Sequence, residues 1–265
     1  MTILVMTKLT QKDFHQLCPR GYITLPIETV EAHAFERTHA KPNFPYLSFR
    51  QLEALKVIHA IKIAERNVVD FSVFVGEEGS TRMTVTSANR RLKGMVDKGY
   101  LEMVKTGRPV ANYYHLTEMG FRFLRHQPYS TDFSPKQWAR ITAVNKVFTR
   151  LCETYRVEKR GNIGWETEPK VTLKSGEIWK PMALSAIWEN GECTQAKAYI
   201  VLDSIFVEEI EGELSTLRQT YEKLLEDDMV KAFDVVIVSK DTSEEIPFIT
   251  NGEFVDLPDE LYHLI

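Results

Sequence analysis

The spacing of apolar residues predicts an amphipathic helix over residues 49–66. Ser48 and Gln51 form a Ser-x-x-Gln capping box, a pattern typical of a helix N-terminus. A short apolar run at 71–75 predicts a second helix, capped by Asp70. The apolar positions that recur at roughly helical spacing are Leu52, Leu55, Ile58, Ile61 and Ile63.

A polar and basic stretch at residues 86–98 predicts a third helix. Ala88, Leu92 and Val96 recur on one of its faces. Gly99 stands where a left-handed residue commonly ends a helix. One side of this helix is therefore expected to pack inward, while its basic side faces solvent.

Two strand-like runs follow, at 100–104 and 111–116, and they flank a turn with a basic tip at 106–109. This pattern predicts a β-hairpin. Thr117 is placed to cap a last helix over 118–125. The predicted order of this block is helix, helix, basic helix, hairpin, helix.

The second half of the chain alternates between helical and strand-like periods. An apolar face over 135–155 predicts a long helix, and an acidic amphipathic helix is predicted over 207–225. Asn190 and Gly191 are typical of the turn of a hairpin. The predicted strands are 164–169, 179–188, 195–204 and 233–239. The resulting order is helix, three strands, helix, strand.

The composition is that of an ordinary globular protein, with 265 residues, 43% hydrophobic and 26% charged. That length predicts one or two domains with cores of their own. No apolar run reaches the roughly 20 residues that span a bilayer, and no leader pattern is evident, so a cytoplasmic protein is expected. The three cysteines form no C-x-x-C pair, and no phosphate-binding loop, metalloprotease or hydrolase motif occurs. We therefore expect no disulfide, metal or cofactor.

The charge is distributed unevenly along the chain. The whole chain carries a net charge of −4, but residues 46–126 contain 13 Lys and Arg against 8 Asp and Glu, a net +5. Residues 193–265 contain 5 against 17, a net −12. This split favours a protein in which one half meets a polyanion. The alternative is two solvated surfaces that differ by chance.

Two stretches of the basic block are similar to a known fold. Arg91-Leu-Lys-Gly-Met-Val-Asp-Lys-Gly-Tyr-Leu101 and Tyr114-His-Leu-Thr-Glu-Met-Gly120 resemble the recognition helix and wing of a winged helix-turn-helix domain of the MarR-like kind. The resemblance implies DNA binding, because a helix fits the major groove and Lys and Arg neutralise phosphates. His59 and His115 are expected to pack or to lie at the surface, and not to bind metal.

The candidate DNA contacts lie on the predicted third helix, its N-terminal approach and the wing. Helix 86–98 would read the major groove, and wing 105–109 would contact the flanking backbone. Arg and Asn are the residue types that pair with guanine and adenine edges. For each basic residue the alternative is a solvated helix face. The candidates are Arg82, Thr84, Thr86, Ser87, Asn89, Arg90, Arg91, Lys93, Lys105 and Arg108.

The order of elements after residue 134 is that of a restriction-endonuclease-like fold, and with the upstream winged helix it resembles the replication-relaxation family of plasmids and other mobile elements. That family carries a Pro-Asp pair and an acidic Glu-x-Asp or Glu-x-Lys pattern, but here Met182 and Val201 occupy the expected acidic positions. Metal-dependent hydrolysis needs converging carboxylates, so the departures imply an incomplete site and no enzyme activity. The vestigial candidates, which could alternatively be surface carboxylates at strand ends, are Glu166, Glu168 and Asp203.

The predicted fold class is α+β multidomain, a winged helix-turn-helix followed by an α/β restriction-endonuclease-like domain lacking a complete catalytic site. The predicted domains are an N-terminal extension 1–45, a DNA-binding domain 46–126, a linker 127–134 and a nuclease-like domain 135–265. The predicted function is sequence-specific binding of double-stranded DNA, as a transcriptional regulator or replication-initiation factor of a mobile element. We expect a homodimer, with a replication or transcription protein as a further partner and no membrane. The alternatives are a protein-interaction adaptor and a Mg²⁺-dependent nuclease.

Overall fold

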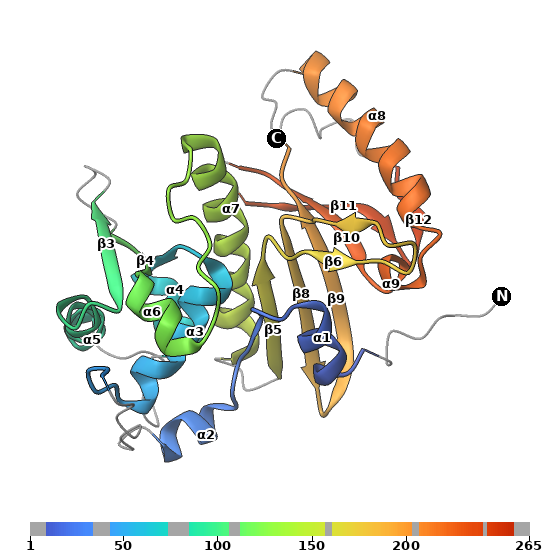
Figure 1. Ribbon diagram of the computed structural model, residues 1–265. Helices are drawn as coiled ribbons and strands as arrows, with labels where there is room; N and C mark the ends of the chain where they lie inside the picture. Colours follow the sequence, from blue (N-terminus) through green and yellow to red (C-terminus); the bar gives the residue numbers. More distant parts are fainter. Residues whose placement is uncertain are drawn as a thin grey trace. The chain divides into compact units, whose positions relative to one another are not determined.

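The structure is a computed structural model, drawn in Figure 1. It describes residues 9–33, 43–73, 85–105, 112–156, 161–202, 207–240 and 243–256. Helices and a multi-stranded sheet occur together, which confirms the α+β class. Within these residues, no helix combines the length and the apolar character needed to cross a membrane.

The chain divides into two compact units. Unit 1 comprises Met1–Gly21, Ser134–Val147 and Gly164–Ile265, and unit 2 comprises Tyr22–Phe133 and Phe148–Ile163. Part of the predicted N-terminal extension thus contributes helix α1 (Gln11–Leu17) to unit 1. Segments far apart in the sequence therefore build one core.

Unit 1 is organised around a mixed sheet. Its strands are hydrogen-bonded in the order β5 (Asn162–Thr167), β8 (Ala183–Glu189), β9 (Glu192–Ile200), β10 (Asp234–Val238), β11 (Glu245–Thr250) and β12 (Glu253–Phe254). β9 and β10 run parallel, and α8 (Val207–Leu224) and α9 (Asp228–Lys231) form the crossover that a parallel pair requires. β6 (Val171–Thr172) and β7 (Ile178–Trp179) form a separate antiparallel pair. The acidic helix and the strand at 233–239 are thus confirmed within one or two residues.

The Asn190-Gly191 turn joins β8 to β9. The two strands pair antiparallel, which confirms the predicted hairpin. Asn190 has φ +53° and Gly191 has φ +86°. Two positive φ values in succession define the turn whose twist matches that of paired strands, and asparagine followed by glycine adopts it with little strain.

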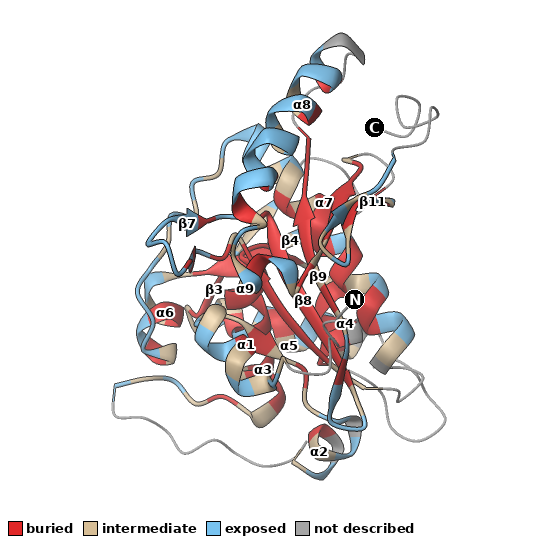
Figure 2. Ribbon diagram, turned by 90° about the vertical axis from the view of Figure 1, so that its right-hand side faces the viewer, coloured by how far each residue is buried: buried red, intermediate tan, exposed pale blue. Residues whose placement is uncertain are grey.

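Burial in unit 1 follows the sheet. Figure 2 shows the central strands β8 and β9 buried along most of their length, with the outer side of α8 exposed. On the inner side of α8, the Tyr221 hydroxyl accepts a hydrogen bond from Trp179 Nε1 at 3.1 Å. Burial raises the pKa of Tyr221 to about 12. Helix α1 joins this core through Phe14, whose ring meets Trp188 edge-on at 5.6 Å between centroids.

Unit 2 combines short helices with a small antiparallel sheet of order β2-β4-β3. α7 (Pro135–Leu151) begins in unit 1 and ends in unit 2, where a π-helical turn (Cys152–Arg156) follows it. The remaining elements of unit 2 are β1 (Tyr22–Ile23), α2 (Ile27–Ala32), α3 (Phe49–Ile61), β2 (Ala64–Glu65), α4 (Arg66–Ser72), α5 (Val85–Asp97), β3 (Leu101–Lys105), β4 (Asn112–Leu116) and α6 (Glu118–Leu124).

The predicted helix ends of unit 2 are confirmed where a local signal marks them. Ser48 Oγ accepts from the backbone N–H of Gln51, and the Gln51 side chain accepts from the backbone N–H of Ser48. Thr117 Oγ1 accepts from the N–H of Gly120 at the start of α6. Gly99 has φ +80° after α5, as a C-terminal glycine should.

The predicted cap at Asp70 is wrong. Helix α4 begins five residues earlier, after Glu65, and Asp70 lies inside it, where it accepts a hydrogen bond from Arg66 Nε at 3.1 Å. Val68 and Val69 are buried in the core of unit 2. Packing of these two valines, and not a side-chain cap, places the start of this helix, because tertiary context overrides local preference.

Candidate nucleic-acid interface

Helix α5 exposes one polar and cationic face. Asn89, Arg90 and Lys93 are exposed, and their spacing of one, three and four residues places them on one side of the helix. We call these three side chains the α5 outer face. Within the described part of the chain, no hydrogen bond or ion pair engages them. The residues that α5 buries on its other side are Ala88, Leu92 and Met95.

Ser87 and Arg91 lie on the flank of α5, between the buried side and the outer face, and both are half-buried. The Gln51 side-chain amide donates to the backbone carbonyl of Arg91 at 3.3 Å, which holds this flank against the first turn of α3. Burial lowers the pKa of Arg91, and the charges of Arg50 and Arg90 lower it further. Arg50, in the first turn of α3, is buried, and no sequence pattern distinguishes a buried arginine from an exposed one.

The hairpin β3–β4 supplies part of the predicted wing. Lys105 is exposed at the end of β3 and is opposite Asn112 in the register. Arg82, Thr84 and Arg108 lie outside the described residues, and so does the side chain of Thr86. Of the predicted DNA contacts, the structure thus brings together the α5 outer face and its flank, with Lys105 on the following hairpin.

The C-terminal end of α5 is anchored by two polar side chains. Lys98 Nζ donates to the carbonyl of Tyr46 at 2.6 Å, and the Tyr100 hydroxyl donates to the carbonyl of Pro45. Because Lys98 is engaged in this way, it belongs to the support of the helix and not to the exposed cationic face.

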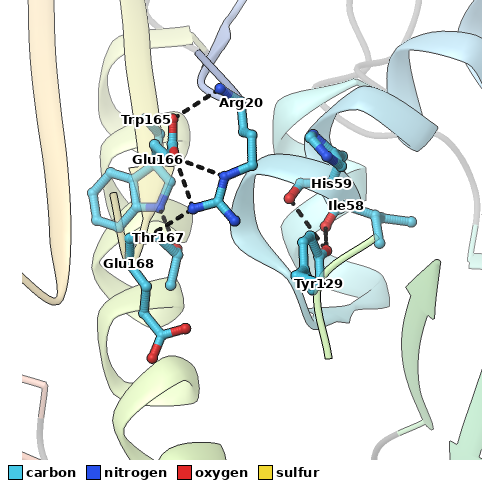
Figure 3. A network of polar contacts seen from close by, with 8 residues as sticks. All are labelled: Arg20, Ile58, His59, Tyr129, Trp165, Glu166, Thr167 and Glu168. Atoms are coloured by element: carbon cyan, nitrogen blue, oxygen red, sulfur yellow. Dashed lines mark hydrogen bonds and ion pairs between the residues drawn. The ribbon is translucent and has the colours of Figure 1, made fainter. Parts of the chain in front are cut away.

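The C-terminal end of α3 is held by Tyr129. Its hydroxyl donates to the carbonyl of His59 at 3.2 Å, as Figure 3 shows, and Lys62 Nζ lies 5.1 Å from the centre of its ring. The His59 ring is buried and stacks on His126. His115 is buried as well, with Nδ1 3.1 Å from the Leu116 carbonyl. Of the two roles expected for these histidines, packing and a surface position, the structure shows packing.

Within unit 1, Glu166 is 1% exposed and is bound by Arg20 (Figure 3). Arg20 Nε and Nη2 lie 3.0 and 2.9 Å from Glu166 Oε1, and the backbone N–H of Arg20 donates to Oε2 at 3.0 Å. Arg20 Nη2 also donates to the carbonyl of Glu168 at 2.8 Å. The interpretation of Glu166 as a surface carboxylate is therefore wrong, because both of its oxygens are engaged in a buried ion pair.

The resemblance to a restriction endonuclease would place a nuclease site at the start of strand β8. The Met182 carbonyl accepts from the N–H of Glu168, and the Met182 N–H donates to the carbonyl of Tyr199. Met182 is 6% exposed and Val201 1%, so apolar side chains are packed where acids would be expected. Asp203 lies outside the described residues. Elsewhere in the described chain, no group of three His, Cys, Asp or Glu side chains is arranged to hold a metal.

Comparisons with family models, with curated proteins and with solved structures found no match. The resemblances to the replication-relaxation family, to a winged helix-turn-helix and to a restriction endonuclease therefore stay predictions. So do the predicted domain boundaries.

Proposed function

We propose that this protein binds double-stranded DNA in a sequence-specific manner, with α5 in the major groove. The observation that carries the proposal is the α5 outer face, an exposed amide and two exposed cations on one side of a 13-residue helix whose other side is firmly packed. An α-helix fits the major groove of B-DNA, and its exposed side chains can then reach base edges.

The order of elements in unit 2 supports a winged helix-turn-helix as the finer fold. Helices α3, α4 and α5 are followed by the hairpin β3–β4 and then by α6. In this arrangement α5 is the recognition helix and the hairpin is the wing. Lys105 on β3 would then neutralise a phosphate beside the site that α5 reads.

The outer face offers distinct chemistry at each position. The Asn89 amide can pair with the N6 and N7 groups of adenine, and the Arg90 guanidinium with O6 and N7 of guanine. Each such bidentate pair discriminates against a wrong base by about 1–3 kcal/mol. Lys93, as a single point charge, suits a phosphate better than a base pair.

We propose that unit 1 has a nuclease-like fold and no catalytic activity. Its proposed role is dimerisation or contact with a replication or transcription protein. The order of α7, β5, β8, β9, α8 and β10 supports the fold. The buried Met182 and Val201 support inactivity, since converging carboxylates are needed to hold Mg²⁺. Dimerisation is proposed because specific DNA sites are commonly read as paired half-sites.

The double variant Arg90→Ala, Lys93→Ala is expected to lose affinity for DNA on the order of 100-fold, because one base contact and one phosphate contact disappear. The measurement is fluorescence anisotropy on a duplex selected from random oligonucleotides. The control is Arg122→Ala, Lys223→Ala, which removes two exposed helical cations elsewhere. Equal affinity of both double variants would contradict the proposal. Absence of binding by the wild-type protein at any salt concentration would favour the adaptor alternative.

Supercoiled plasmid is expected to stay uncut when it is incubated with the protein and Mg²⁺, because Met182 and Val201 replace the metal-binding acids. Gel electrophoresis over several hours measures nicking. Cleavage that disappears in the Asp203→Ala variant would show that the unit is an active nuclease.

A further inference from the structure

We infer that Gln51 is a positioning residue for the reading of DNA sequence. Its hydrogen bond to the Arg91 carbonyl fixes the rotation of α5 about its own axis, and so the direction in which the α5 outer face points. The inference rests on the proposed function and deepens it. To the exposed side chains that touch DNA it adds a buried side chain of α3 that acts through them.

The side-chain amide of Gln51 serves two helices at once. Its oxygen accepts from the backbone N–H of Ser48 at 3.2 Å, so the N-terminus of α3 fixes the side chain. Its nitrogen donates to the Arg91 carbonyl at 3.3 Å. Gln51 is 8% exposed, so little water competes for either bond. One end of the amide is therefore held by α3, and the other end holds α5.

The bond reaches the middle of α5, because Arg91 is the central residue of this helix. A Cβ placed on Gly94, three residues on, would lie 3.6 Å from the Gln51 amide nitrogen, so the amide lies against this side of the helix. A carbonyl has two lone pairs, and the helical N–H four residues on uses one. The Arg91 carbonyl can therefore accept from Gln51 and keep its place in the helix.

The contact matters because it has a direction. The residues that α5 buries are apolar, and apolar packing has no preferred angle, whereas a hydrogen bond does. At the radius of helical side chains, about 5–6 Å, a rotation of 10–20° moves a side-chain tip by about 1–2 Å. A binding constellation has to be held within about 0.5 Å. The Gln51 bond is thus suited to keep Asn89 and Arg90 aimed at base edges.

The test compares affinities for the selected duplex and for a scrambled duplex of the same composition, measured by fluorescence anisotropy. Gln51→Met keeps the length of the side chain and removes the amide. Gln51→Glu keeps an oxygen for the Ser48 N–H but puts an acceptor where the Arg91 carbonyl needs a donor. In both variants the ratio of the two affinities should fall about tenfold, the order of one bidentate base contact. The added charge of Gln51→Glu acts on both duplexes alike and cancels in the ratio.

Ser48→Ala is the matched control, because it removes the hydroxyl cap of α3 and leaves the bond from Gln51 to Arg91 in place. Its ratio should stay at the wild-type value. In the background of Asn89→Ala, Arg90→Ala, Gln51→Met should change the ratio no further, because the side chains through which it acts are gone. Thermal unfolding verifies that each variant is folded at the temperature of the measurement.

A wild-type ratio in both Gln51 variants would overturn the inference while leaving the proposed function standing. An equal fall in Ser48→Ala would overturn it too, because the cap of α3, and not the link to α5, would then set the specificity. If the wild-type protein binds neither duplex, or binds both equally, the proposed function itself fails and the inference falls with it.

Discussion

Replacing Arg20 with alanine is expected to lower the free energy of unfolding by about 3–5 kcal/mol, because the buried carboxylate of Glu166 loses its counter-charge. The Glu166 side chain is 2% exposed and that of Arg20 is 24% exposed, so water screens this pair poorly. The substitution also removes the hydrogen bond from Arg20 to the Glu168 carbonyl. Chemical denaturation followed by tryptophan fluorescence measures the effect, since Trp165 is buried beside Glu166 in β5.

A second variant separates the charge from the packing. In Arg20→Met, Glu166→Gln both charges are absent, so the protein should recover a large part of the stability that Arg20→Ala loses. Arg20→Lys should recover less, because an ammonium cannot reproduce the fork that meets both Glu166 and Glu168. A change below about 1 kcal/mol in Arg20→Ala, the range of an exposed ion pair, would contradict this account of the site.

Elements whose signals are local could be predicted from the sequence. Ser48 and Gln51 lie three residues apart and cap each other, and Asn190 and Gly191 are adjacent in their turn. Gly99 ends α5 in a backbone conformation that glycine adopts readily. In each case the residues that form the feature lie within a few positions of one another in the sequence. Their order along the chain is therefore enough to predict the cap, the turn or the helix end.

Features that depend on distant contacts could not be predicted. Arg20 and Glu166 are 146 residues apart, and nothing in either neighbourhood indicates that they meet. The start of α4 was misplaced because burial of Val68 outweighed a capping residue type at Asp70. The same contrast holds within unit 2. The outer face of α5 follows from the helical period, whereas the burial of Arg50 depends on how α3 packs.

Gly120→Ala is expected to lower the free energy of unfolding by about 2–3 kcal/mol, as overpacking of a filled site does. A Cβ at this position would lie 2.6 Å from the backbone carbonyl oxygen of Tyr100 and 3.1 Å from Leu116 Cγ. The carbonyl cannot move aside easily, because it accepts a hydrogen bond from the N–H of Thr117 at 3.1 Å. Helix α6 must therefore shift away from Tyr100, the residue just before β3.

Gly212→Ala is the matched control, because it makes the same chemical change in the exposed part of α8, where the added carbon meets nothing within 4 Å beyond its chain neighbours and the backbone of its own helix. There the higher helix propensity of alanine should raise the free energy of unfolding by about 0.5–1 kcal/mol. Urea denaturation of both variants gives the comparison. The changes in the free energy of unfolding should have opposite signs, a loss for Gly120→Ala and a gain for Gly212→Ala, if the close approach of α6 to the Tyr100 backbone sets the effect at Gly120. If both variants gained stability, the added carbon at residue 120 would fit without a clash. That result would contradict the close contact between α6 and the Tyr100 carbonyl.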